Sequence, residues 1–322
     1  MESIYWVISR DCNQRCPHCY NHSEPGAPGL TLEDIPRVVA NLPDPDDVRV
    51  DRIILSGGEV LVWPELLFGA LRELHTRYGD RVRLFMQTNG DLLDGPMLDR
   101  LLAHHVSRIS VASMDKYHWK STRERRGELT ELFESRGMIS TEILEHATGA
   151  TGTAPRGYSF WGATDDLWIG KLWPRGRAMQ KKLSKAGPDD RFCADWSGAK
   201  GFLNYREPGS EVNVQLADVY PCCPMTCRPL GSLLAEPLIA IFDRCAADPV
   251  YRALNEGRPE KMGEHLGITE EYAEQRTREL GNHCLWCDEF FTKHAPDMLL
   301  HGATTERGDS DLLTLGLHKA GA

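Results

Sequence analysis

Short apolar runs alternate along the first third of the chain with longer segments whose apolar residues recur at helical spacing. The runs at 4–8, 48–55, 82–86 and 109–112 predict strands, and the segments between them, at 31–42, 63–78 and 97–104, predict helices. Strands and helices that alternate at this spacing predict an α/β fold with a parallel sheet, either a TIM-like barrel or a doubly wound sheet.

Chemically distinctive residues follow the expected strands. Cys12, Gly57, Thr88 and Ser113 each come just after one of the four apolar runs. In parallel α/β folds the functional groups gather at the carboxyl ends of the strands. The pattern therefore predicts one site at that edge of the sheet.

The pattern is weaker in the middle of the chain. Residues 149–157 are rich in Gly, Thr and Pro and predict a loop, and 167–172 predicts a fifth strand. Residues 214–223 predict a β-hairpin, and 239–247 predicts a helix.

The composition is that of an ordinary globular protein and excludes some classes. The 322 residues are 41% hydrophobic and 26% charged, with a net charge of −10. An acidic chain is unsuited to general nucleic-acid binding, and no apolar run reaches the roughly 18 residues of a membrane span. The N-terminus lacks the pattern of a signal peptide, so ten cysteines predict metal ligands in a cytoplasmic protein rather than disulfides.

Three of these cysteines form a compact motif. Cys12, Cys16 and Cys19 follow the first strand with the spacing C-x3-C-x2-C. Three thiolates can hold three irons of a [4Fe–4S] cluster and leave the fourth iron open, or to a remote ligand. Zinc is the alternative, although structural zinc sites prefer two separated cysteine pairs. The triplet favours the cluster.

The triplet, together with Ser56-Gly57-Gly58-Glu59 at the end of the second strand, resembles the radical S-adenosylmethionine (SAM) superfamily. The resemblance implies a partial (β/α)6 TIM-like barrel over residues 1–188. It implies that the open iron binds SAM, and that reductive cleavage yields a 5′-deoxyadenosyl radical that removes a hydrogen atom from a substrate. It also implies an electron donor such as flavodoxin or ferredoxin. The residues expected to contact SAM are His18, Gly57, Gly58, Glu59, Thr88, Asn89, Ser113, Asp115 and Arg177, the last in a Gly-Arg-Ala motif near the SAM carboxylate.

The later cysteines resemble the "twitch" module, the shortened form of the SPASM domain, which holds an auxiliary [4Fe–4S] cluster. This implies a second domain at 189–292, a tail at 293–322, and the ligands Cys193, Cys222, Cys284 and Cys287. The family usually has Gly five residues before the hairpin cysteine, where this chain has Ala217, so the choice between Cys222 and Cys223 stays open. A structural zinc with the same ligands is the alternative.

Three cysteines remain outside both sets. Cys245 lies in an expected helix and is interpreted as a small buried hydrophobe. Cys223 and Cys227 flank the hairpin, which borders the substrate in twitch enzymes. Each is therefore a candidate catalytic thiol that donates a hydrogen atom to a substrate radical. Polar residues that are candidates for holding a substrate are Asp115, His118, Arg156 and Asp165.

Related twitch enzymes act on aminocyclitols and aminoglycosides, and close relatives mature peptides. Only eleven residues precede Cys12, so we expect no N-terminal peptide-binding domain. The sequence therefore favours a carbohydrate-like small molecule in natural-product biosynthesis, with epimerisation, dehydrogenation or decarboxylation as the reaction. A peptide maturase is one alternative. An iron–sulfur electron carrier or scaffold is another, and the Gly-Gly-Glu motif counts against it because a carrier does not need SAM.

Overall fold

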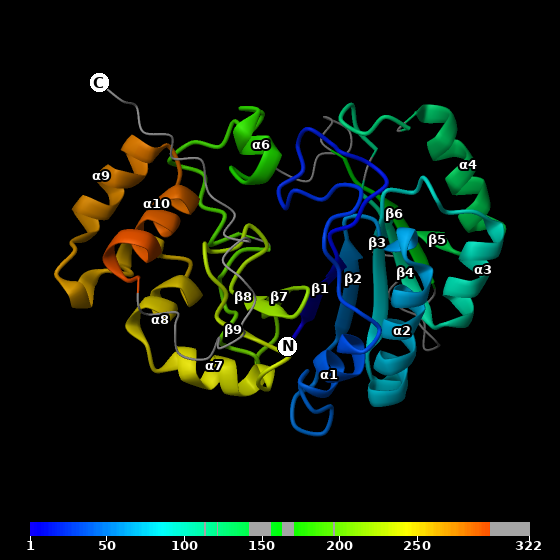
Figure 1. The fold of residues 1–322 in the computed structure, drawn as a ribbon, viewed down its shortest axis with the longest axis horizontal. Coiled ribbons are helices and arrows are strands. Elements are labelled where there is room, and N and C mark those ends of the chain that lie inside the picture. Colours follow the sequence, from blue (N-terminus) through cyan, green and yellow to red (C-terminus); the bar gives the residue numbers. More distant parts are fainter. Residues whose placement is uncertain (113, 121, 142–155, 163–170, 196, 297–322) are drawn as a thin grey trace.

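A single nine-stranded sheet runs through the computed structural model, in the order β5-β6-β4-β3-β2-β1-β7-β8-β9. The structure describes residues 1–112, 114–120, 122–141, 156–162, 171–195 and 197–296 (Figure 1). The strands from β5 to β7 are parallel, and the last two pairings are antiparallel. The strands are β1 (Ser3–Ser9), β2 (Arg52–Gly57), β3 (Arg83–Thr88), β4 (Val106–Val111), β5 (Ile139–Ser140), β6 (Gly157–Phe160), β7 (Glu211–Gln215), β8 (Asp218–Tyr220) and β9 (Gly231–Ser232).

The four N-terminal helices lie on one side of this sheet (Figure 1). In α2 the apolar face predicted from spacing is the face that is buried, and Leu67, Leu71 and Leu74 are fully buried. Gly79 ends α2 with a φ of +55°, in the left-handed region that glycine adopts easily. The helices are α1 (Asp34–Ala40), α2 (Pro64–Tyr78), α3 (Gly95–Ala103) and α4 (Arg123–Glu134).

The last four helices of the described chain pack beyond the antiparallel edge of the sheet, at the left of Figure 1, and the short helix before them lies near the loop after β1. Their bounds are α6 (Gly176–Gln180), α7 (Leu238–Ala246), α8 (Pro249–Asn255), α9 (Glu270–Leu280) and α10 (His283–Glu289). Short 3-10 turns lie at Val60–Val62, Gly79–Arg81, Pro259–Lys261 and Glu264–Leu266, and a π-helical turn at Phe290–His294 follows α10. None of the helices within the described ranges is long and apolar enough to cross a membrane.

The four N-terminal strands confirm the sequence prediction, but the middle of the chain differs from it. Most of the strand expected at 167–172 and most of the loop expected at 149–157 lie outside the described residues, and residues 171 and 172 are not in a strand. Among the described residues of this region is a short strand, β6, which pairs in parallel with β4 from Arg108↔Gly157 to Val111↔Phe160. Four residues that begin with glycine are too few to give a periodic signal, so the sequence did not reveal it.

The predicted hairpin is present as β7 and β8, but it is not a separate arm. β7 joins the free edge of β1 in parallel register, from Ser3↔Glu211 to Val7↔Gln215. The indole N–H of Trp6 donates a 2.7 Å hydrogen bond to the carbonyl of Leu216 in the hairpin turn. The sheet therefore continues across the expected domain boundary at residue 188.

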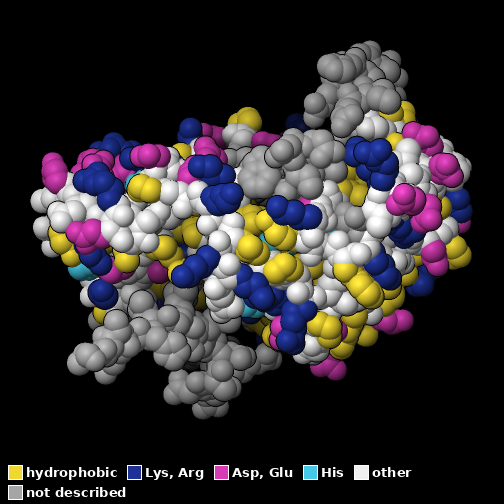
Figure 2. Space-filling model, turned by 90° about the horizontal axis from the view of Figure 1, so that it is seen from above, with side chains coloured by type: hydrophobic (Ala, Val, Ile, Leu, Met, Phe, Trp, Pro, Cys, Tyr) yellow, Lys and Arg dark blue, Asp and Glu magenta, His cyan; other side chains and the backbone are white. Residues whose placement is uncertain are grey.

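Figure 2 looks onto the upper end of the molecule in Figure 1, where the loop after β1 lies. Lys and Arg side chains gather around the middle of this face, whereas Asp and Glu side chains lie mainly toward its two ends (Figure 2). The local field there favours anionic groups even though the whole chain carries a net charge of −10.

Candidate active site and metal centres

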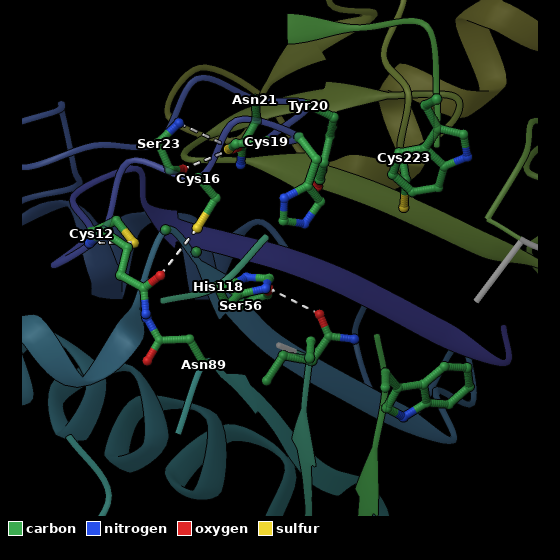
Figure 3. Close-up of a pocket in the computed structure, with 18 of the residues that line it drawn as sticks. Cys12, Cys16, Cys19, Tyr20, Asn21, Ser23, Ser56, Asn89, His118 and Cys223 are labelled. Atoms are coloured by element: carbon green, nitrogen blue, oxygen red, sulfur yellow. Dashed lines mark hydrogen bonds between the residues drawn. The ribbon is translucent and has the colours of Figure 1, made fainter. Parts of the chain in front are cut away.

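A cavity of about 240 Å³ lies at the carboxyl ends of β1 to β4 (Figure 3). The cavity thus lies at the edge of the sheet where the sequence predicted a site. The site residues foreseen from the sequence that line it are Cys12, Cys16, His18, Cys19, Gly57, Gly58, Thr88, Asn89, Arg177 and Cys223.

The three-cysteine loop forms one wall of the cavity. Cys12 and Cys16 are buried and Cys19 is half-buried. The Cys16 thiol donates to Oε1 of Gln14 at 3.3 Å, and the Cys19 thiol donates to Oδ1 of Asn21 at 3.0 Å. Burial, with the charge of neighbouring cysteines as a smaller cause, raises the pKa of Cys12 and Cys16 to about 12. Thiolates in such a place need a bound cation, and three on one loop fit a cluster with one open iron.

The two glycines of the Gly-Gly-Glu motif allow this loop to pass close to β2. A Cβ on Gly57 would lie 2.6 Å from the carbonyl oxygen of Ser9, and one on Gly58 would lie 2.4 Å from that of Asp11. The N–H of Gly58 donates to Ser9 at 2.8 Å, and the N–H of Glu59 donates to Asp11 at 2.9 Å. The motif therefore pins the start of the cysteine loop to the second strand.

The carboxylate of Glu59 is fully enclosed and binds other protein groups. It accepts hydrogen bonds from the N–H of Asn89 at 2.6 Å, the hydroxyl of Thr88 at 2.8 Å and the N–H of Leu61 at 3.0 Å. Burial raises its pKa to about 7, against the opposing effect of these hydrogen bonds. Glu59 is not among the described residues that line the cavity, whereas Thr88 and Asn89 are. Glu59 therefore acts on the cavity by holding these two residues in place.

Arg177 lines the cavity, but its guanidinium is occupied by the cysteine loop. Its Nε donates to the carbonyl of Cys16 at 2.8 Å and its Nη2 to that of Ser23 at 2.5 Å, while Nη1 lies 3.4 Å from the carboxylate of Glu24. The backbone N–H of Arg177 donates to the carbonyl of Cys19 at 2.9 Å. The geometry thus makes Arg177 a clamp on the loop, a role that the expected contact with a SAM carboxylate did not foresee.

Two histidines lie beside the loop. His18 stacks on Tyr117 with ring centroids 4.9 Å apart and contacts the edge of His118 at 4.8 Å. His118 lines the cavity, and its Nδ1 is 2.9 Å from a carboxylate oxygen of Asp115. Burial by itself would raise the pKa of Asp115, but the hydrogen bond and charge of His118 outweigh it and lower the pKa to about 2. Asp115 thus orients His118.

Among the described residues, Arg156 does not line the cavity. Arg156 donates to the carbonyl of Leu102 at 3.0 Å, on the backbone of α3. Ser113 and Asp165 lie outside the described residues.

A polar wall that sequence analysis missed is built from three neighbouring strands. The hydroxyl of Tyr5 on β1 lies 2.7 Å from the Ser56 hydroxyl on β2 and donates to Oε1 of Gln87 on β3 at 2.7 Å. The Ser56 hydroxyl also reaches that Gln87 oxygen, at 3.2 Å. All three residues line the cavity. The two-residue alternation of each strand marks such inward positions but does not say which side chains meet.

The second cysteine set comes together away from this cavity. Cys193 follows α6, Cys222 follows β8, and Cys284 and Cys287 are on α10. Burial raises the pKa of Cys193, Cys222 and Cys287, and the charge of other members of the set adds to this, in Cys287 after the charge of Asp288. Four enclosed thiols that repel one another as thiolates fit an iron–sulfur cluster or a zinc ion.

The structure separates the adjacent hairpin cysteines. Cys222 lies with the second set, whereas Cys223 lines the cavity and projects toward it from the side away from the three-cysteine loop (Figure 3). Cys227 is near Asp288 and Arg228 and is not among the described lining residues. Cys245 is in the hydrophobic core on α7. Of the two candidate catalytic thiols, only Cys223 is therefore at the cavity.

Comparisons with known proteins find similarity to one family in the N-terminal part of the chain. Residues 6–135 match the family model described as the Radical SAM superfamily. A curated relative, the AdoMet-dependent heme synthase of Methanosarcina barkeri, is 30% identical over 148 residues, which are 45% of this chain and 39% of the relative. The match thus spans well under half of that relative's length.

Solved structures with a similar course of the chain share little sequence with it. BtrN in complex with AdoMet and 2-DOIA is 14% identical, with a TM-score of 0.49 over 84% of this chain and 90% of that chain. The anSMEcpe structure with bound AdoMet is 12% identical, with a TM-score of 0.45 over 87% and 98%. SuiB of Streptococcus suis is 10% identical, with a TM-score of 0.42 over 79% and 67%. The family match covers residues 6–135, the part of the chain that carries Cys12, Cys16, Cys19 and the Gly-Gly-Glu motif, and this part is similar to the radical SAM superfamily.

Proposed function

We propose that this chain is a radical SAM epimerase that acts on a carbohydrate-like small molecule. The observation that carries the proposal is the position of Cys223 at the cavity, across from Cys12, Cys16 and Cys19. A thiol is a good hydrogen-atom donor, and a donor on the far side of a substrate returns hydrogen to the opposite face of the carbon.

Each cysteine set has its own role in the proposed reaction. Cys12, Cys16 and Cys19 would hold the cluster that binds SAM, and Cys193, Cys222, Cys284 and Cys287 would hold an auxiliary cluster. When bound, the first cluster supplies the electron that cleaves SAM to methionine and a 5′-deoxyadenosyl radical. Gly57, Gly58, Thr88 and Asn89 form the wall next to the cysteine loop, where SAM would lie. The relative named as an AdoMet-dependent synthase supports SAM as the co-substrate.

The thiol step balances with one external donor. The S–H bond of Cys223 breaks, a C–H bond forms on the substrate radical, and a thiyl radical remains on Cys223. One electron from a flavodoxin- or ferredoxin-type donor and one solvent proton restore the thiol. Burial raises the pKa of Cys223, which keeps the proton on sulfur, as hydrogen-atom donation requires.

The polar wall supports a hydroxylated substrate. The hydroxyls of Tyr5 and Ser56 and the amide of Gln87 can exchange their mutual hydrogen bonds for bonds to sugar or cyclitol hydroxyls. Peptide maturation remains the second candidate, and a carrier without chemistry would have no need for a thiol opposite the cysteine loop.

The test is anaerobic turnover with SAM and dithionite in deuterium oxide, using a panel of aminocyclitols, amino sugars and sugar nucleosides. We expect 5′-deoxyadenosine and an epimer with one solvent deuterium at the inverted carbon. Cys223→Ala should keep 5′-deoxyadenosine formation and lose the epimer, while the matched control Cys227→Ala should behave as wild type. A ketone, or released carbon dioxide, from the wild-type enzyme would instead identify a dehydrogenase or a decarboxylase.

A further inference from the structure

We infer that Arg175 is a positioning residue of the second cysteine set, and that Arg175-Gly176-Arg177 is a joint that ties this set to the SAM-site cysteine loop. The inference rests on the auxiliary cluster of the proposed function and adds a residue that neither the sequence pattern nor the expected ligand set indicated.

Arg175 is buried among the segments that carry the second set. Its Nε donates to the carbonyl of Pro224 at 2.9 Å, and its Nη2 donates to the carbonyls of Met225 at 3.2 Å and Cys284 at 3.0 Å. Its Nη1 lies 2.7 Å from a carboxylate oxygen of Asp288. One guanidinium thus fixes the loop after Cys222 to the helix α10.

Arg175 also brings a positive charge to this site, because its Nη2 donates to the carbonyl of Cys284 and its Nη1 pairs with Asp288, the residue after Cys287. The ion pair with Asp288, 2.7 Å from Nη1, compensates the buried guanidinium. A buried arginine is tolerated when anions surround it. An iron–sulfur cluster with four thiolates would be such an anion, and charge and hydrogen bonds around a cluster tune its reduction potential.

Gly176 lets the two arginines face different sites. It adopts a φ of +54°, and a Cβ there would lie 2.3 Å from the carbonyl oxygen of Tyr20 and 2.6 Å from that of Cys19. The residue on one side, Arg175, reaches the second set, and the residue on the other side, Arg177, reaches Cys16 and Ser23. Three consecutive residues therefore fix both cysteine sites at once.

If Arg175 acts through its charge, variants of Arg175 and of Asp288 should shift the reduction potential of the auxiliary cluster in opposite directions. Reduction adds negative charge to a cluster, so loss of the nearby cation in Arg175→Gln should lower the reduction potential of the auxiliary cluster. Asp288→Asn removes the anion that offsets Arg175 and should raise it. A purely structural role would perturb the site in the same way in both variants.

The experiment is an EPR-monitored redox titration in a Cys12/Cys16/Cys19→Ala background, where only the auxiliary cluster remains. Arg276→Gln is the matched control, because Arg276 forms a two-point ion pair with Glu289 of the same helix, α10. We expect a lower potential in Arg175→Gln, a higher one in Asp288→Asn, and none of these shifts in Arg276→Gln. If Arg175→Gln loses the cluster, Arg175→Lys takes its place in the test. Because it keeps the charge, we expect its auxiliary cluster to have the reduction potential of the parent protein.

Iron analysis of the background protein separates this inference from the proposed function. About four irons per chain confirm the auxiliary cluster. If they are present and Arg175→Gln titrates like its parent, or if both charge variants shift the same way, the inference on Arg175 is wrong. If the parent holds zinc or no metal, the auxiliary cluster itself is wrong and the inference falls with it.

Discussion

The Nε of Arg177 donates a 2.8 Å hydrogen bond to the backbone carbonyl of Cys16, across 161 positions of sequence. Because a carbonyl, and not a ligand, receives this bond, the arginine shapes the loop that presents the cysteines. The same guanidinium also binds Ser23, so the loop is held at two points. The arrangement makes the metal site depend on a residue far outside its motif.

Arg177→Lys keeps the charge and loses the fork that reaches both carbonyls. A lost charged hydrogen bond costs about 1.5–3 kcal/mol, and we expect the free energy of unfolding of the apo protein to fall by about 2 kcal/mol. Iron bound at the SAM site should fall as well. Chemical denaturation and iron analysis measure the two effects. Unchanged stability and iron content in Arg177→Lys would show that the clamp is dispensable.

Gly58→Ala should disrupt the three-cysteine loop, because the new Cβ would meet the Asp11 carbonyl at 2.4 Å. Backbone atoms cannot yield as a flexible side chain can, so the loop must move. We expect destabilisation of about 2–4 kcal/mol and loss of the SAM-site cluster. Gly127→Ala in helix α4 is the matched control, since a Cβ there would meet nothing within 4 Å beyond its chain neighbours and the backbone of its own helix, and it should be neutral or stabilising by up to about 1 kcal/mol.

The Cys12/Cys16/Cys19→Ala triple variant should form no 5′-deoxyadenosine from SAM and dithionite. It should retain an iron–sulfur absorption from the second cysteine set, because those four thiols come from other segments of the chain. Product analysis by chromatography measures the first effect, and iron content measures the second. SAM cleavage that survives in this variant would contradict the assignment of the loop.

Reconstitution of the wild-type protein with iron and sulfide should give about eight irons per chain, which is about four for each of two clusters. Cys284→Ala combined with Cys287→Ala should reduce this by half and leave SAM cleavage in place. Metal analysis and Mössbauer spectroscopy provide the count. Zinc in a wild-type protein that holds only half the iron would identify the second set as a structural zinc site.

The sequence predicted those parts of the molecule whose determinants are local. Cys12, Cys16 and Cys19 sit on one loop, and the strand before them is a continuous apolar run, so spacing alone located both. The partners of Arg177 and Arg175 are remote backbone carbonyls, which carry no side-chain signature. No pattern in the sequence therefore indicated that the two arginines serve different sites.

The sequence also did not reveal which distant strands pair with one another. The apolar alternation in β7 shows that a strand forms, but it does not show which edge it joins. The same holds for Tyr5, Ser56 and Gln87, whose hydroxyls and amide meet only after three strands are in register. Cys222 and Cys223 are neighbours of one residue type, and only the course of the backbone after β8 gives them different surroundings.

The parallel pairing of β7 with β1 limits how this protein can be divided. A fragment that ends near residue 188 would leave β1 as a bare sheet edge, with the indole of Trp6 deprived of its Leu216 acceptor. Such an edge invites pairing with other chains, so a truncated barrel should aggregate. The C-terminal portion is therefore not an exchangeable cassette, and a chimera that imports another auxiliary module must also import a strand able to complete β1.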